Sequence, residues 1–141
     1  MATALQNLQE PTTLPRAQPA KVAPSRITEL VIPSSEHQAV LLPMMRYLGD
    51  TNAHQWLTLI SQSNQQQQPL KAHGVNPHTL RVIQAQSTHD VLWMTWEALS
   101  NGTSHTVIAE LGPQPQDVLK ELERAAAEGN CRLILVRCRS N

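Results

Sequence analysis

Residues 106–136 read TVIAELGPQPQDVLKELERAAAEGNCRLILV, and this stretch indicates the fold class. It contains two short, continuous apolar runs at residues 106–109 and 133–136, which are typical of strands covered on both faces. Between them, apolar residues recur at helical spacing from Pro115 to Gly129, so a helix is predicted there. A strand, a helix and another buried strand in succession favour a parallel β-α-β unit.

The same alternation continues towards the N-terminus. Apolar runs at residues 27–32, 56–60 and 80–83 predict three earlier strands, with helical segments between them. We therefore expect an α/β domain over residues 26–141. Its sheet should be mostly parallel, with about five strands and helices on both faces.

Three further helical segments are expected before residue 106. One covers residues 41–48 and should close at Gly49 in the left-handed conformation. A short helical turn covers residues 70–74. A third helix should begin after a cap at Ser87 or Thr88 and stop at Asn101-Gly102.

The third of these helices is apolar on more than one face, because it carries Trp93, Met94 and Trp96 besides its other apolar residues. A helix on the surface of a monomer would show a single apolar stripe. We therefore expect this helix either to be sandwiched within the fold or to cover another chain. The second alternative predicts a homodimer.

Residues 1–25 differ in composition from the rest of the chain. Pro11, Pro15, Pro19 and Pro24 are spaced through Gln, Thr and Ala without any hydrophobic period. This composition predicts a disordered tail with polyproline character. A role as a Pro-rich ligand for a partner is the alternative, but no aromatic anchor accompanies the prolines.

The junction between the first expected strand and the first expected helix reads Pro33-Ser34-Ser35-Glu36 and contains no glycine. A nucleotide-binding α/β domain would carry a Gly-rich phosphate loop with a lysine at this kind of junction. None of the five glycines of the chain is placed to form such a loop. We therefore expect no P-loop and no cofactor. A domain of this architecture without a nucleotide site is expected to bind another macromolecule.

The bulk properties exclude several classes of function. The formal net charge is zero and the pI is about 7.0, so strong attraction to nucleic acid or to a membrane surface is not expected. No apolar run is long enough to span a membrane, and Cys131 and Cys138 are expected to be free thiols in a reducing cytoplasm. The six histidines do not pair at helical spacing, and no nucleophile motif occurs, so neither a metal site nor catalytic residues are predicted.

Basic residues in the middle of the chain are the best candidates for a binding surface. Lys71 and Arg81 could lie near each other beside Leu57 and Leu70, if the loops at one edge of the sheet converge. That arrangement would give an apolar centre with a positive rim, as protein interfaces commonly have. The alternative is that these are scattered, solvated charges.

Several local strings, taken in their order and spacing, resemble the SulA family, the SOS-induced inhibitors of bacterial cell division. The resemblance covers residues 27–137. The strings are Leu41-Leu42-Pro43 with Leu48-Gly49, Gln55-Trp56-Leu57-Thr58, Ala98-Leu99 with Asn101-Gly102, and Ala125-Ala126-Ala127-Glu128-Gly129-Asn130.

The resemblance implies a RecA-like three-layer fold that has lost nucleotide binding. It also implies a partner, the tubulin-like GTPase FtsZ, whose polymerisation and GTPase activity the dimeric inhibitor blocks after DNA damage, so that septation stops. Leu57 and Arg81 fall at positions that the family associates with FtsZ binding, as an apolar anchor and a charged contact. Leu70 and Lys71 lie in the adjoining segment.

The resemblance further implies Lon protease as a partner, because better-known members of the family end in a tail that Lon reads. This chain departs from that pattern, since it ends at Arg139-Ser140-Asn141, soon after the last expected strand. The rival interpretation of the whole chain is a RecA-like accessory protein that acts on single-stranded DNA or on a recombinase. The neutral charge and the few aromatic residues favour the division inhibitor.

Overall fold

The structure is a computed structural model that describes residues 25–51, 54–63 and 67–139. The predicted tail, apart from Ser25, lies outside these ranges, as do the last two residues of the chain. None of the helices within the described ranges is both long and apolar enough to cross a membrane.

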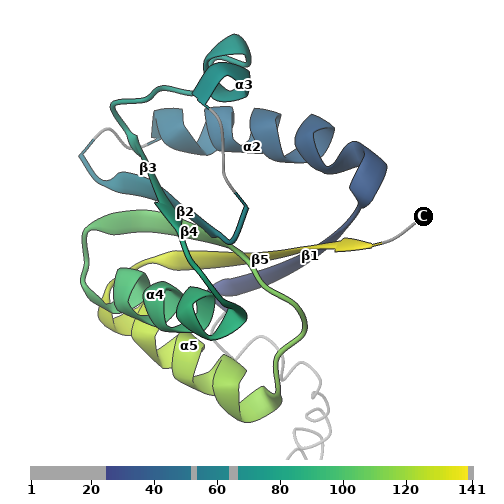
Figure 1. Cartoon of the computed structure of the whole chain (residues 1–141). Helices are drawn as coiled ribbons and strands as arrows, with labels where there is room; N and C mark the ends of the chain where they lie inside the picture. The colour runs from purple at the N-terminus through teal and green to yellow at the C-terminus, as the bar shows by residue number, and fades with distance from the viewer. Residues whose placement is uncertain (1–24, 52–53, 64–66, 140–141) are drawn as a thin grey trace, which may run out of the picture.

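Five strands form one sheet in the order β1-β5-β4-β2-β3, and every neighbouring pair is parallel (Figure 1). The predicted parallel sheet of five strands is therefore confirmed. β1 and β3 are the edge strands, and β4 lies at the centre. The strands are β1 (Ile27–Pro33), β2 (Trp56–Ser61), β3 (Leu80–Gln84), β4 (Ser104–Glu110) and β5 (Arg132–Arg139).

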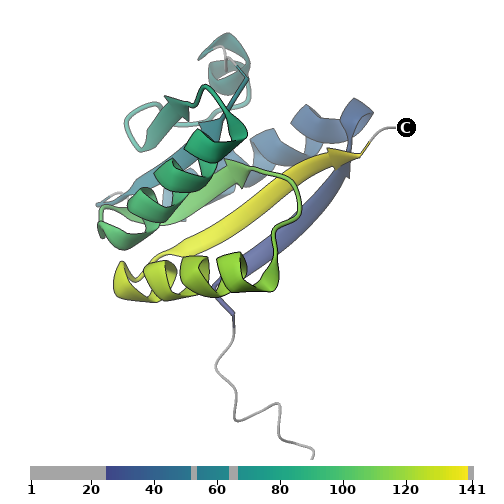
Figure 2. The ribbon, with the colours of Figure 1, turned by 60° about the horizontal axis from the view of Figure 1, so that its bottom comes forward.

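Helices cover both faces of the sheet, so the fold has the three layers that were expected. α2 (His37–Thr51) and α3 (Gln67–Ala72) cover one face, while α4 (Thr88–Ser100) and α5 (Gln116–Glu128) lie side by side on the other (Figures 1 and 2). A short 3-10 helix, η2 (Ser34–Glu36), joins β1 to α2.

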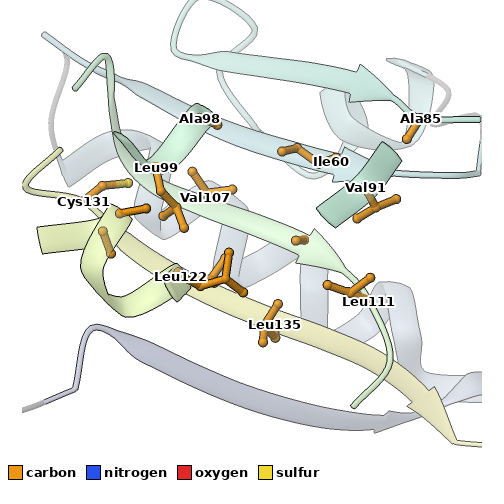
Figure 3. Close-up of a cluster of buried hydrophobic side chains, with 14 residues drawn as sticks. Ile60, Ala85, Val91, Ala98, Leu99, Val107, Leu111, Leu122, Cys131 and Leu135 are labelled. Carbon is orange, nitrogen blue, oxygen red and sulfur yellow. The ribbon is translucent and has the colours of Figure 1, made fainter. Parts of the chain in front are cut away.

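Each face of the sheet has its own apolar core, because side chains alternate between the two faces along every strand. The core under α4 and α5 includes Leu99, Val107 and Leu122, whose side chains point towards one another in Figure 3. The core under α2 and α3 includes Met45 and Leu57. The central strands are covered on both sides, which explains why their sequences are continuously apolar.

The helix ends agree with the sequence at α4 and α5 but not at α2 and α3, which cover His37–Thr51 and Gln67–Ala72 instead of 41–48 and 70–74. Ser87 caps α4, since its Oγ accepts a hydrogen bond of 3.1 Å from the backbone N–H of Asp90. The expected stop at Gly49 is wrong, because α2 continues to Thr51. Gly49 is instead a buried contact point, where an added Cβ would lie 3.3 Å from Oγ1 of Thr79.

Candidate partner-binding surface

Arg81 lies on the edge strand β3 and projects towards the layer of α4. It pairs in register with Thr58 of β2. The neighbours of Thr58 along the strand, Leu57 and Leu59, belong to the core under α2 and α3. Because side chains alternate, Thr58 and Arg81 face the other side of the sheet.

The guanidinium group of Arg81 is held by three hydroxyl groups. Its Nη2 donates to the side-chain oxygens of Thr58, Thr103 and Ser104, at 3.3, 3.2 and 3.2 Å respectively. The hydroxyls of Thr58 and Ser104 are themselves 2.7 Å apart and share a hydrogen bond. Thr58 lies on β2, while Thr103 and Ser104 are consecutive residues where β4 begins, so two distant stretches of the chain hold one side chain.

Trp56 completes the surroundings of Arg81. The guanidinium carbon lies 5.8 Å from the centroid of the indole ring, within the range of a cation–π contact. Trp56 keeps 37% of its surface exposed, so the pair reaches the surface. None of the carboxylates in the described ranges forms an ion pair with Arg81, and its buried Nε has no hydrogen-bond partner there.

The result is a positive charge that is fixed in place and that no described carboxylate neutralises. Arginine and tryptophan are the residues that most often dominate the binding energy of protein interfaces. A charge held in one geometry also loses less side-chain entropy when a partner binds. This arrangement suits contact with an acidic group of another macromolecule.

The other three residues expected at this surface are placed differently. Leu57 and Leu70 do lie together, but inside the core under α2 and α3, with 0% and 6% of their surfaces exposed. Lys71 is exposed near the end of α3, on the same side of the sheet as that core. The structure therefore joins Leu57 to Leu70 but puts Lys71 and Arg81 on opposite faces of the sheet.

Lys71 lines an open pocket of about 840 Å³ between α2 and α3. Arg46 and His73 line the same pocket, and Asp50 adds one negative charge to it. The side chain of Arg46 packs over Gly74, where an added Cβ would meet Nε of Arg46 at 3.2 Å. This pocket is a second cationic area, which the sequence did not indicate because Arg46 and Lys71 come from different helices.

The topological switch point of the sheet is a further place to look for a site. It lies at the carboxyl ends of β2 and β4, because these neighbouring strands continue into helices on opposite faces. Ser61 donates there to Glu110 Oε1 at 2.7 Å, and His37 Nε2 lies 3.2 Å from Glu110 Oε2. His37 and Glu110 do not form a hydrogen bond despite this distance.

Two features of the switch point bear on nucleotide binding. The junction without glycine at residues 33–36 follows the edge strand β1, and the next residue, His37, contacts Glu110 at the switch point. The chain leaves β2 there through Gln62 and Ser63, and the sequence of residues 62–66 contains no glycine either. In sequence, residues 33–36 and 62–66 thus lack the glycines that a phosphate loop requires.

The two cysteines are both free thiols, with Cys131 buried and Cys138 exposed. Burial raises the pKa of Cys131 to about 11 from an ordinary value of 9.0. Within the described ranges, no group of three or more His, Cys, Asp or Glu side chains is placed to hold a metal ion.

Selective alkylation checks this placement of the cysteines. At pH 8 we expect iodoacetamide to modify Cys138 and to leave Cys131 unmodified, because two pKa units lower the thiolate fraction about 100-fold and burial blocks access. Mass spectrometry of the intact protein should show one added group, and two after unfolding in urea. Because the folded pKa is raised, the stabilising contribution of Cys131 is complete below pH 9 and is lost as the pH rises towards 11. Rapid double labelling of the folded protein would contradict this placement.

Comparisons with known proteins give relatives for the chain. No family model matches it. The curated cell division inhibitor SulA of Pseudomonas aeruginosa is 32% identical over 99 residues, which are 70% of this chain and 62% of that protein. The match therefore spans less than two thirds of that relative's length. The crystal structure of SulA from Pseudomonas aeruginosa has a TM-score of 0.76 and 29% identity, and the alignment covers 82% of this chain and all of that one.

Proposed function

Because this chain belongs to the SulA family, we propose that it inhibits bacterial cell division by binding a division protein, without catalysing a reaction. Two findings support the proposal. The curated relative is named a cell division inhibitor, and the likeness to the crystallised SulA extends over the whole of that chain. The partner that we propose is FtsZ.

The observation that carries the proposal is the anchored guanidinium of Arg81 beside the exposed ring of Trp56. In our proposal Arg81 pairs with the acidic catalytic loop of FtsZ, and Trp56 provides the apolar contact next to it. Head-to-tail polymers require two different faces on each subunit, so covering one face prevents the next subunit from adding. The same cover blocks GTP hydrolysis, because that loop completes the active site of the neighbouring subunit.

The remaining proposed residues take roles that fit their burial. Leu57 has no exposed surface, so in the proposal it supports β2 next to Thr58 and acts on FtsZ through that strand. Leu70 supports α3 in the same way, and Lys71 contributes a positive charge that reaches solvent from α3.

The proposal also includes the setting in which the protein acts. We place it in the cytoplasm during the SOS response to DNA damage, as a homodimer and as a substrate of Lon protease. Light scattering over a range of concentrations tests the dimer, and a monomer at every concentration would remove it from the proposal. The half-life of the chain in cells with and without Lon tests the protease in the same way.

Sedimentation of FtsZ polymers with GTP tests the function directly. Purified FtsZ should lose its pelletable polymer when this protein is present at about equimolar amounts, because capping acts subunit by subunit. GTP hydrolysis should fall in parallel with the polymer. An unchanged pellet in the presence of excess protein would reject FtsZ as the partner.

A further inference from the structure

An aromatic groove runs between α4 and α5, on the surface of the helical layer. Its volume is about 580 Å³, and its walls carry Trp93 and Trp96 from α4 and Val118 and Leu122 from α5. The two indole rings meet edge to face, with centroids 5.8 Å apart. Trp93 keeps 54% of its surface exposed and Trp96 keeps 38%.

The indole rings of Trp93 and Trp96 are not part of the buried core. α4 packs on the sheet through its buried residues Val91, Thr95, Ala98 and Leu99, while Trp93 and Trp96 point away from that side. Exposed aromatic residues that gather in one place mark a binding surface more often than isolated ones do. The groove is therefore open to an apolar ligand.

The charges around the groove select the kind of ligand. Asp117 and Glu121 of α5 lie on its rim and are exposed. Among the described residues Glu121 pairs with Arg124 alone, one turn further along the helix, in an ion pair of 2.6 Å whose two side chains are both exposed. Such surface pairs are weak, so both carboxylates remain able to attract a cation. The groove suits an apolar segment that also carries positive charges.

The described chain begins at the helix that forms one wall of this groove. Ser25 Oγ donates to Glu123 Oε1 at 2.7 Å, and the backbone N–H of Arg26 donates to Glu123 Oε2 at 2.9 Å. Glu123 is only two residues from Glu121, on the side of α5 that faces β1. The described chain therefore begins next to α5, and 24 residues precede Ser25 in the sequence.

Those residues have the length and the chemistry to fill the groove. A polyproline II segment rises 3.1 Å per residue, so residues 15–24 would span about 31 Å, against a helix diameter of roughly 10 Å. The segment carries Pro15 and Pro19, together with the cations Arg16 and Lys21. Proline-rich segments in this conformation bind aromatic grooves, because the free segment is already extended and loses little conformational entropy on binding.

We propose that residues 11–24 dock across α5 into the groove of their own chain. Pro15 and Pro19 pack against Trp93 and Trp96, and the charges of Arg16 and Lys21 face Asp117 and Glu121. The aromatic groove thus gains an intramolecular cover, and the Pro-rich segment gains the aromatic anchors that its own sequence lacks. This inference is independent of the proposed division partner, because it concerns a different surface from that of Arg81. It leaves the proposed homodimer to a surface other than the groove between α4 and α5.

Paramagnetic broadening in the full-length protein tests the proposal. The variant Cys138→Ser with Ala20→Cys leaves one accessible thiol, since Cys131 is buried, and a nitroxide is attached to it. All three tryptophans, Trp56, Trp93 and Trp96, lie outside the Pro-rich segment, so their indole N–H signals report on the folded part alone. We expect the signals of Trp93 and Trp96 to lose most of their intensity relative to the reduced nitroxide, and the signal of Trp56 to lose less.

The matched variant carries Arg16→Glu and Lys21→Glu in the same labelled background. Charge reversal should restore the signals of Trp93 and Trp96, because like charges would then meet at the rim. Full intensity of both signals before the reversal would overturn the proposal. Broadening that appears only when labelled and isotope-enriched molecules are mixed would assign the groove to a second copy and would also overturn it.

Discussion

Replacing Arg81 by glutamate is expected to abolish the inhibition of FtsZ. The wild-type guanidinium is held by three hydroxyl groups and an indole ring, and no described carboxylate pairs with it. Removing one partner of an interface charge pair commonly costs about 2–5 kcal/mol, and reversing the charge adds repulsion. We therefore expect binding to weaken by at least about 30-fold, measured by titration of FtsZ polymer in the sedimentation assay.

Two further variants distinguish an effect of the charge at residue 81 from an effect on folding. Arg124→Glu makes the same charge change at an exposed position of α5 and should inhibit as the wild type does. Arg81→Lys keeps the positive charge but loses the planar set of guanidinium donors. Its inhibition of FtsZ should therefore lie between that of the wild type and that of Arg81→Glu. Far-UV circular dichroism and the midpoint of urea unfolding check that Arg81→Glu is folded. Wild-type inhibition by a folded Arg81→Glu protein would remove Arg81 from the interface.

Replacing Gly129 by alanine is expected to have the largest effect on stability. Gly129 follows α5 and packs against the end of α4, where an added Cβ would lie 1.7 Å from the carbonyl oxygen of Leu99 and 2.9 Å from its carbonyl carbon. Both atoms belong to the backbone, so a change of side-chain rotamer cannot relieve the clash. The helices must move apart, and we expect the free energy of unfolding to fall by roughly 3 kcal/mol.

The control for this variant is Gly112→Ala. A Cβ at Gly112 would meet no atom within 4 Å, so we expect a change in the free energy of unfolding within about 0.5 kcal/mol. Urea unfolding followed by far-UV circular dichroism gives both values. Equal midpoints for the two variants would show that α4 and α5 do not meet at Gly129.

Much of the fold could be predicted from the sequence because its signals are local. The alternation of apolar runs with helical spacing marked the strands and helices in their correct order. Ser87 as a cap of α4 is a contact within one turn of chain, and Gly129 follows α5 as predicted. Gly49 was interpreted wrongly, because a glycine that admits a close neighbour looks the same in sequence as one that ends a helix.

The candidate site was harder to predict because it depends on which strands become neighbours. The sequence drew attention to Arg81, but it could not show that Thr58, Thr103 and Ser104 meet its side chain. Leu57 was expected as a contact at the surface. It is buried because β4 covers one side of β2 and β3 the other, and because α2 and α3 close over its side chain.

The sequence by itself determined an α/β chain of alternating strands and helices, with no phosphate loop, because propensity, capping and apolar periodicity act over a few residues at a time. Only the tertiary structure decided the order of the strands, and with it the face on which each side chain lies. That order brought Arg81 to its three hydroxyls, separated it from Lys71 and aligned Trp93 and Trp96 along α5. Contacts between distant segments form only when the whole sheet closes, so no short stretch of sequence encodes them.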